Sequence, residues 1–315
     1  MKHDLAIIGA GPAGLNASVY ASRYGIKNII IGEVSGGLTT TTFDIGNWLG
    51  TQKISGMDFA QKSADHAKSY GVEIIAGKVD KIDKNPPQSP FKKGGREGGF
   101  RLLFNDGKKI EARAILLTMG TKYRKLGIPG EEELSGKGVS YCATCDGYFY
   151  KGKAVAVIGG GDSAAESAVF LSGIAEKIYI IYRKDKLKAE SFWVKSIEGN
   201  SKIEIIYSTN VKEIKGENKV EELILDNPFN NSNTLKADGI FIEIGADPST
   251  DLAKSIGAQL DDGGYIKIGS DGKTTVDGVW AAGDITTGSN KFKQIITAAA
   301  EGAIAANSIQ QYLKK

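Results

Sequence analysis

Short runs of consecutive apolar residues recur along this chain, and glycine or a polar turn follows most of them. Runs of this kind are typical of strands buried on both faces, as in a parallel sheet. They predict strands at residues 5–8, 28–31, 114–117, 154–158, 177–181 and 279–282. Segments with helical character predict helices near residues 12–24, 56–70, 163–171 and 292–313.

The strand–helix–strand pattern occurs twice, which indicates an α/β fold with two Rossmann-like, three-layer domains. The chain returns to the first domain near its end, so we expect the second domain to be inserted into the first. The expected division is residues 1–115 and 246–315 for the first domain and 116–245 for the second. Residues 203–243 predict a meander of short strands. Residues 85–99, rich in proline, glycine and lysine, predict a loop.

The first apolar strand leads into Gly9-Ala10-Gly11-Pro12-Ala13-Gly14, a Gly-x-Gly-x-x-Gly motif that opens a helix. The first glycine permits a tight turn, the second lets a pyrophosphate approach the backbone, and the third lets helix and strand pack closely. Glu33 follows the next strand, at the position that binds ribose hydroxyls. We therefore expect a bound dinucleotide in the first domain. Asp284, after a later strand, is placed to reach the ribityl or phosphate oxygens of a flavin.

The second domain repeats this logic with Gly159-Gly160-Gly161-Asp162-Ser163-Ala164, which fits Gly-x-Gly-x-x-Ala. No acid stands at the end of the following strand. Arg183 and Lys184 stand there instead, and Lys188 follows one helical turn later. Cations at this place favour the 2′-phosphate of NADP over the 2′-hydroxyl of NAD. The alternative is that these cations form a solvated surface.

The chain has two cysteines, Cys142 and Cys145, and Asp146 follows the second one. Two cysteines at this spacing suit dithiol–disulfide exchange, and a carboxylate one residue away can transfer a proton to or from a sulfur. Half of a zinc site is a weaker interpretation, because only His3 and His66 could add ligands and both are distant in sequence. We expect no metal. A purely structural disulfide would stabilise the fold little, because its loop is so short.

Composition narrows the class of protein. Hydrophobic residues make up 41% and charged residues 24% of the chain, as in globular proteins. A net charge of +3 gives no reason to expect nucleic acid as a partner. We find no apolar run long enough for a membrane span and no signal peptide. A lone redox pair of cysteines suits the reducing cytoplasm.

Together these motifs resemble those of the low-molecular-weight thioredoxin reductases, homodimeric flavoproteins of the pyridine nucleotide-disulfide oxidoreductases, class II. The Cys-Ala-Thr-Cys-Asp-Gly stretch is highly specific to that family, because larger disulfide reductases carry their cysteines in the flavin domain. The resemblance implies that NADPH reduces FAD, that FAD opens the Cys142–Cys145 disulfide, and that the dithiol reduces thioredoxin or a thioredoxin-like protein. It also implies that Cys145 faces the flavin, that Cys142 attacks the partner, and that Asp146 is the proton donor. The domains would rotate about crossovers near residues 113–120 and 243–247.

The resemblance also implies two sets of cofactor contacts. Those to FAD are Gly9, Gly11, Pro12, Ala13, Gly14, Glu33, Gly37, Leu38, Thr39, Asn47, Val79, Gly283, Asp284, Gln294 and Ile295. Those to NADPH are Gly159, Gly161, Asp162, Ser163, Ala164, Arg183, Lys184 and Lys188.

The chain departs from the family pattern at several positions. Gly37 stands where members usually carry glutamine, and Leu49 where they carry proline. The usual His-Arg-Arg and a later arginine appear as Tyr182-Arg183-Lys184 and Lys188, and lysine lacks the bidentate fork of arginine. Two other functions therefore stay open: a flavin-dependent dithiol oxidase or reductase with another electron donor or acceptor, and a nucleotide-binding scaffold with a structural disulfide.

Overall fold

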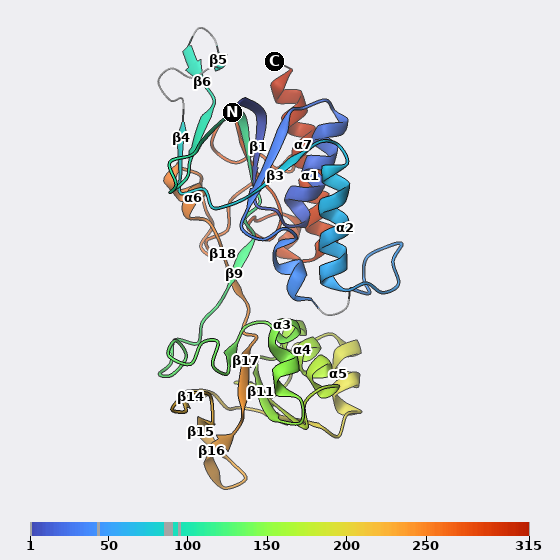
Figure 1. The fold of residues 1–315 in the computed structure, drawn as a ribbon, viewed down its shortest axis with the longest axis vertical. Helices are drawn as coiled ribbons and strands as arrows, with labels where there is room; N and C mark the ends of the chain where they lie inside the picture. Colours follow the sequence, from blue (N-terminus) through green and yellow to red (C-terminus); the bar gives the residue numbers. More distant parts are fainter. Residues whose placement is uncertain (1, 43–44, 85–90, 94–95, 315) are drawn as a thin grey trace. The chain divides into compact units, whose positions relative to one another are not determined.

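The computed structural model describes residues 2–42, 45–84, 91–93 and 96–314. The chain divides into two compact units. Unit 1 contains Met1–Lys122 and Asp247–Lys315, and unit 2 contains Tyr123–Ala246. Unit 2 is thus inserted into unit 1 (Figure 1).

Unit 1 is built on a sheet with the strand order β3-β2-β1-β8-β7-β4, in which β19 also pairs with β8. Its strands are β1 (Lys2–Ile8), β2 (Asn28–Gly32), β3 (Glu73–Ala76), β4 (Lys81–Lys84), β7 (Phe100–Leu103), β8 (Lys109–Leu117) and β19 (Val279–Ala281), beside a separate pair, β5 (Phe91–Lys93) and β6 (Arg96–Gly98). Strand β1 runs parallel to β2 and β8. Its apolar residues Leu5 to Ile8 are at most 4% exposed, because both faces of the sheet are covered.

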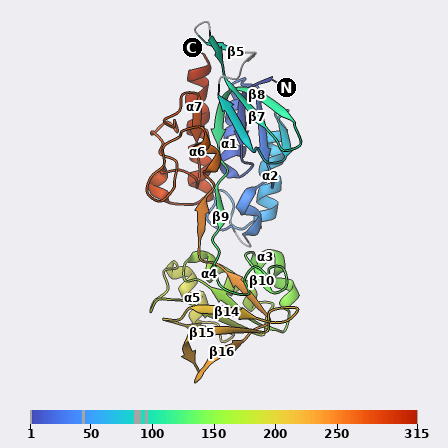
Figure 2. The ribbon, with the colours of Figure 1, turned by 90° about the vertical axis from the view of Figure 1, so that its left-hand side faces the viewer.

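Helices cover one face of this sheet. Unit 1 has α1 (Pro12–Arg23), α2 (Gly56–Lys68), α6 (Asp251–Ser255) and α7 (Ile295–Leu313), with the 3₁₀ turns η1 (Gly37–Thr41) and η3 (Ser289–Lys291). Helices α1, α2 and α7 lie along the same face (Figures 1 and 2) and share one hydrophobic core with β1. The other face packs against a second core that includes residues of α6.

Two local predictions for unit 1 need correction. The last helix begins at Ile295 and not at residue 292, because Phe292 (ψ 93°) and Gln294 (ψ 155°) have extended backbone angles, which an α-helix does not allow. Thr39, Thr40 and Thr41 lie in the 3₁₀ turn η1. Of the loop predicted at residues 85–99, residues 91–93 and 96–98 instead form the antiparallel strands β5 and β6, and residues 85–90 and 94–95 lie outside the described residues.

Unit 2 contains a parallel sheet with the strand order β10-β17-β11-β12-β13. Its elements are β10 (Val139–Ser140), α3 (Ala143–Asp146), η2 (Gly147–Tyr150), β11 (Ala154–Ile158), α4 (Asp162–Ser172), β12 (Lys177–Ile181), α5 (Ser191–Glu198), β13 (Ile203–Ile206), β14 (Val211–Lys215), β15 (Glu222–Phe229), β16 (Ser232–Lys236) and β17 (Gly239–Ile242). The meander predicted for residues 203–243 is confined to the antiparallel strands β14 to β16, because β13 and β17 join the parallel sheet. The predicted α/β class, with Rossmann-like sheets in both units, is confirmed.

The two chain crossings between the units pair with each other. Strands β9 (Thr121–Tyr123) and β18 (Ala246–Pro248) form a small two-stranded sheet. Residue 115, where we expected the first domain to end, lies inside β8, so the chain leaves unit 1 only at Lys122.

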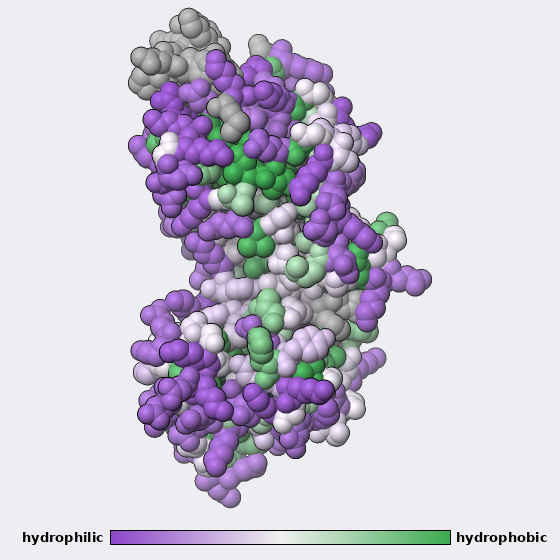
Figure 3. All heavy atoms as spheres, viewed as in Figure 1, coloured by the Kyte–Doolittle hydropathy of each residue, from purple (hydrophilic) through white to green (hydrophobic). Residues whose placement is uncertain are grey.

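Hydrophilic residues cover much of the face of each unit that Figure 3 shows. Within the described part of the chain, no helix combines the length and apolar character needed to cross a bilayer. In the same residues, no group of three or more histidine, cysteine, aspartate or glutamate side chains could hold a metal ion.

Candidate active site

The two cysteines form a disulfide at the start of α3, in unit 2, with a Cα–Cα distance of 5.3 Å. The backbone N–H of Cys145 donates a hydrogen bond to the sulfur of Cys142 at 3.1 Å. The hydroxyl of Thr144 lies 3.3 Å from the same sulfur. Cys145 is exposed and Cys142 is half-buried. The polar hydrogens around Cys142 stabilise negative charge on its sulfur when the disulfide opens.

Asp146 is held by a residue that the sequence did not single out. The hydroxyl of Ser140 donates to a carboxylate oxygen of Asp146 at 2.7 Å, and the backbone N–H of Cys142 donates to the Ser140 oxygen at 3.1 Å. Ser140 is only 5% exposed. It therefore connects the backbone of one cysteine to the predicted proton donor. Its only sequence signal is a hydroxyl at a strand end just before the cysteine pair.

Two large aromatic side chains follow the disulfide at the surface. Tyr148 is 69% exposed and Phe149 is 73% exposed. The backbone between them and the disulfide is fixed, because a Cβ on Gly147 would lie 2.9 Å from Leu171 of α4. Exposed aromatic surface beside a disulfide is typical of a protein-docking site.

The first glycine motif has the geometry that its spacing predicts. Added Cβ atoms would lie 2.2 Å from the carbonyl oxygen of Thr118 at Gly9, and 2.1 Å from the carbonyl oxygen of Gly9 at Gly14. A Cβ on Gly11, by contrast, meets nothing within 4 Å. No side chain caps α1, which starts at Pro12. The free N–H groups of the helix N-terminus therefore border open space, as an anion site requires.

The structure brings several of the other unit 1 residues to this motif. A Cβ on Gly37, in η1, would lie 3.2 Å from the Cα of Gly11. Along η1, Leu38 is 38% exposed and Thr39 is buried. A Cβ on Gly283 would lie 3.0 Å from the Cβ of Ala13.

Asn47 and Gln294, 247 residues apart in sequence, are joined by a hydrogen bond of 3.0 Å from the Asn47 amide to the Gln294 amide oxygen. Ile295 is the first residue of α7. Glu33 is exposed directly after β2. Val79 is the exception, because its side chain is 3% exposed and belongs to the hydrophobic core. Only its backbone could reach a ligand.

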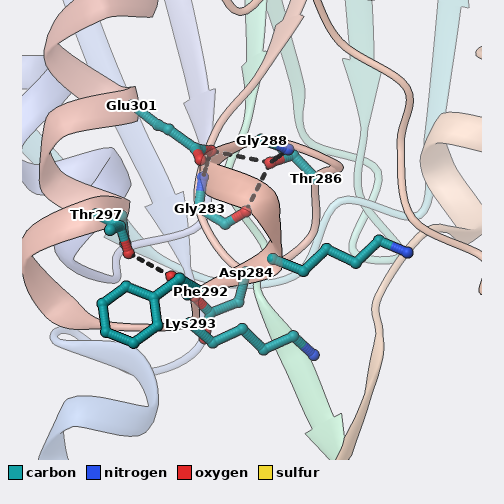
Figure 4. Close-up of a pocket in the computed structure, with 10 residues that line it drawn as sticks. Gly283, Asp284, Thr286, Gly288, Phe292, Lys293, Thr297 and Glu301 are labelled. Atoms are coloured by element: carbon teal, nitrogen blue, oxygen red, sulfur yellow. Dashed lines mark hydrogen bonds between the residues drawn. The ribbon is translucent and has the colours of Figure 1, made fainter.

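Asp284 lines a pocket of unit 1 with Phe292, Lys293 and Thr297 (Figure 4). Burial raises the pKa of Asp284 above its ordinary value, with the charge of Glu301 adding to the rise and that of Lys293 opposing it. A partly desolvated carboxyl group gains when a ligand hydroxyl donates a hydrogen bond to it.

Glu301 is a second residue that sequence reasoning missed. From α7 its carboxylate accepts hydrogen bonds from the N–H of Gly283 at 2.9 Å and the hydroxyl of Thr286 at 2.8 Å (Figure 4). It also accepts one from the hydroxyl of Ser289 at 2.6 Å. It fixes the loop that carries Asp284. An acid within an alanine-rich helix is the only sign of it in the sequence.

The glycine motif of unit 2 has the same form. A Cβ on Gly159 would lie 2.2 Å from the carbonyl oxygen of Glu243, whereas one on Gly161 meets nothing within 4 Å. Ser163 is exposed and Ala164 is buried in α4. Asp162 has a structural partner, because its carboxylate accepts the N–H of Glu190 at 2.7 Å.

The basic segment after β12, which carries Arg183, Lys184 and Lys188, is hydrogen-bonded to this motif. The N–H of Lys188 donates to the carbonyl oxygen of Gly160 at 2.6 Å. Arg183, Lys184 and Lys188 are all exposed. The charge of Lys188 lowers the pKa of Lys184, and Arg183 adds to this effect. Mutually repelling cations beside a glycine loop form a site that an anion would stabilise.

The chain combines a disulfide, two glycine loops and a cluster of cations that would attract an anion. This combination suggests an enzyme that couples a nucleotide to a disulfide. Comparison with known proteins shows its family. The model of the pyridine nucleotide-disulphide oxidoreductases matches residues 3–302. The chain belongs to this family. Its members use a flavin and a nicotinamide nucleotide.

Within the pyridine nucleotide-disulphide oxidoreductases, the chain is similar to named thioredoxin reductases over its whole length. It is 39% identical to the thioredoxin reductase of Bacillus subtilis (strain 168), covering 99% of this chain and 95% of that protein. The structure of the T. acidophilum thioredoxin reductase matches with a TM-score of 0.90 at 37% identity, covering 100% of this chain and 99% of that one. That of the Lactococcus lactis enzyme matches with a TM-score of 0.89 at 32% identity, covering 99% of each chain. The predicted family resemblance is confirmed.

Proposed function

We propose that this chain is a thioredoxin-disulfide reductase that uses NADPH, FAD and the Cys142–Cys145 disulfide in turn. The observation that carries the proposal is the disulfide itself, placed at the start of α3 with Asp146 beside it. The two glycine loops, one in each unit, support separate sites for the two nucleotides. We also propose that the protein acts as a homodimer in the cytoplasm, as the family resemblance implies.

The residues of unit 1 fit FAD. The open space at Gly11, next to the uncapped N-terminus of α1, suits a pyrophosphate. Glu33 is exposed where a ribose would lie, and Asp284 has the desolvated carboxyl that would accept a hydroxyl or ribityl hydrogen. Gly37, Leu38, Thr39, Asn47, Gln294 and Ile295 would form the remaining wall, and Pro12, Ala13 and Gly14 the start of the helix.

The residues of unit 2 fit NADPH. Gly159 and Gly161 form the turn at the start of α4, where a pyrophosphate would meet the helix N–H groups. Arg183, Lys184 and Lys188 would bind the 2′-phosphate. Asp162 acts indirectly, because its bond to Glu190 keeps the basic segment close to the glycine loop.

Bound NADPH and FAD supply the two electrons that open the disulfide. The side chains of this protein transfer the proton and stabilise the charge on sulfur. Asp146 gives a proton to the sulfur that must leave as a thiol, and Ser140 holds Asp146 in place for this transfer. The N–H of Cys145 and the hydroxyl of Thr144 support negative charge on Cys142.

Cys142 then attacks a disulfide of thioredoxin or a thioredoxin-like protein and forms a mixed disulfide. The thiolate of Cys145 attacks Cys142, reforms the internal disulfide and releases the partner as a dithiol, so that two electrons pass to the partner. Tyr148 and Phe149 offer exposed apolar surface for that partner beside the disulfide.

An anaerobic titration with NADPH tests this function. We expect purified protein with bound FAD to lose its flavin absorbance on addition of NADPH and to reduce thioredoxin with turnover. Reduction by dithiol substrates with transfer to oxygen, and no response to NADPH, would favour the dithiol oxidase. A protein that cannot bind flavin would favour a scaffold.

Replacing either cysteine separates the two half-reactions. We expect Cys142→Ser and Cys145→Ser each to abolish thioredoxin reduction, because the exchange needs both sulfurs. Flavin reduction by NADPH should remain, since it does not use them. Stopped-flow absorbance and a coupled thioredoxin assay measure the two steps. Near-wild-type thioredoxin reduction in either variant would contradict the dithiol mechanism.

The basic cluster should determine the choice of electron donor. We expect NADPH to be preferred over NADH in kcat/KM, and Arg183→Ala to lose about 10- to 100-fold of this preference, because a hydrogen bond to a charged group is worth roughly 1.5–3 kcal/mol. The loss should be in KM for NADPH. Lys186→Ala is the matched control, because Lys186 is an exposed cation of the same segment. Equal use of NADPH and NADH by the wild type would show that the cluster binds no phosphate.

A further inference from the structure

Glu243 lies beside the glycine loop of unit 2 and has no role in the mechanism above. It is the first residue after β17, and its backbone N–H donates to the carbonyl oxygen of Ile158 at 2.8 Å. Strands β17 and β11 are parallel, with Ile242 paired with Ile158. Its own carbonyl oxygen lies so close to Gly159 that a Cβ there would approach it to 2.2 Å. Glu243 and the glycine turn therefore occupy neighbouring strand ends.

The carboxyl group of Glu243 points to α4, where the hydroxyl of Ser167 donates to it at 2.9 Å. Burial raises the pKa of Glu243 to about 8, with Glu166 adding to the rise and the bond from Ser167 opposing it. At neutral pH this carboxyl is mostly protonated. The other charged groups on the packed elements are Asp162 of α4, bonded to the N–H of Glu190, and Asp146 of α3.

The strand order places Glu243 at one end of the nucleotide site. In a doubly wound sheet, a dinucleotide lies across the carboxyl ends of the strands, at the point where the strand order reverses. Here β11 has β12 on one side and β17 on the other. The basic cluster follows β12 and would take the 2′-phosphate, at the adenosine half. The pyrophosphate would lie on the turn after β11, so the nicotinamide half extends toward β17 and Glu243.

We propose that Glu243 is a specificity-determining residue that distinguishes the oxidised from the reduced nicotinamide ring by its charge. The inference rests on the proposed NADPH site and names a residue within it. The ring of NADP⁺ carries a positive charge, and the ring of NADPH carries none. A nearby carboxyl is therefore stabilised as the anion by NADP⁺ and is left protonated by NADPH.

The consequence is a proton released when NADP⁺ binds. Binding of NADP⁺ tightens as the pH rises toward the pKa of the free protein, about 8. If the bound cation lowers that pKa by one unit, the affinity for NADP⁺ grows about tenfold over the range. The affinity for a nucleotide with a neutral ring does not change through Glu243. At neutral pH the protonated carboxyl therefore favours release of the oxidised product.

Direct binding measurements on the FAD-loaded protein test this. The probes are NADP⁺ and 1,4,5,6-tetrahydro-NADP, whose ring is uncharged and cannot transfer hydride. Titration of the 2′-phosphate affects both probes alike and cancels in the ratio of their dissociation constants. Calorimetry at pH 6.5, 7.5 and 8.5, in buffers of different ionisation enthalpy, gives both the constants and the protons released.

For the wild type we expect the ratio to move about five- to tenfold in favour of NADP⁺ between pH 6.5 and 8.5, with more protons released on binding of NADP⁺ than of 1,4,5,6-tetrahydro-NADP. Glu243→Gln keeps the shape and can still accept the Ser167 bond, and it should show a constant ratio. A constant ratio in the wild type, or an unchanged slope in Glu243→Gln, overturns the inference.

Glu166→Gln is the matched control and should keep a pH-dependent ratio, because Glu243 remains, with the change moved to lower pH because Glu166 no longer raises the pKa of Glu243. If Glu243→Gln does not fold, the Glu166→Gln variant still tests the proposal. Loss of the slope in Glu166→Gln would assign the proton to Glu166 and refute the proposal for Glu243. Failure of either probe to bind would instead contradict the proposed NADPH site, so the two failures are distinguishable.

Discussion

At the scale of single residues, Ser140 connects the cysteine pair to the proposed proton donor. Its hydroxyl accepts the N–H of Cys142 at 3.1 Å and donates to Asp146 at 2.7 Å. We expect Ser140→Ala to slow thioredoxin reduction about tenfold or more, because a hydrogen bond to a charged group is worth roughly 1.5–3 kcal/mol. Flavin reduction by NADPH should be unchanged. Ser140→Thr restores the hydroxyl and should recover activity, and the exposed Ser135→Ala is a neutral control. Equal losses in both half-reactions would mean that Ser140 only supports the fold.

His3 makes the stability of unit 1 sensitive to acid. Its ring is 7% exposed, and neither nitrogen has a hydrogen-bond partner in the structure. Burial, with the charge of Lys27, lowers its pKa below 6.5. The unfolded chain therefore binds more protons at this residue, and stability falls as the pH drops below about 6.5.

We expect the melting temperature of the wild type to fall between pH 7.5 and 5.5, and that of His3→Leu to fall less, because the leucine has no proton to gain. Thermal unfolding followed by circular dichroism measures this. His66→Leu, at an exposed histidine, is the control and should behave like the wild type. An equal fall in all three proteins would assign the acid sensitivity to other groups.

At the scale of elements, the two strand–glycine–helix turns can be tested against each other. Gly11 and Gly161 are both in extended backbone, which valine adopts readily, and an added Cβ meets nothing within 4 Å at either position. We expect Gly11→Val to lose FAD by a factor of ten or more while still binding 2′,5′-ADP. Gly161→Val should do the reverse. Flavin absorbance after gel filtration and calorimetry measure the two ligands, and loss of both in one variant would indicate misfolding.

The elements were predictable from the sequence to the extent that local pattern determines them. Buried apolar runs and glycine spacing located β1, β2, β11 and β12, and helical character located α1, α2 and α4, whereas α5 was not predicted. The start of α7 was missed because Phe292 and Gln294 have extended backbone angles that no local sequence signal indicates. Ser140, Glu243 and Glu301 were missed for a different reason. Glu243 and Glu301 act through contacts to residues 12 to 76 positions away, which exist only after folding. The contacts of Ser140 are only 2 and 6 positions away, but they depend on the turn from β10 into α3, which the sequence pattern did not reveal.

At the scale of the whole molecule, the chain is discontinuous in one unit and continuous in the other. Unit 2 is the single stretch Tyr123–Ala246, with hydrophobic cores of its own, whereas unit 1 needs both ends of the chain. We expect residues 123–246, expressed alone, to fold and to bind 2′,5′-ADP, and residues 1–122 alone to remain unfolded. Circular dichroism and calorimetry measure this, with Arg183→Ala in the fragment as the control for specific binding. An unfolded fragment would mean that unit 2 depends on unit 1.

The pairing of β9 with β18 has a consequence for recombination between related genes. The two places where the chain passes between the units are neighbouring strands of one small sheet. A recombination event with both crossover points in the codons for these strands exchanges unit 2 as a block and leaves every strand of the unit 1 sheet intact. The cysteine pair and the basic cluster both lie in that block. If the proposed function is right, a chimaera made in this way would exchange the redox disulfide and the proposed NADPH site in a single step and would keep the proposed FAD site of unit 1 unchanged.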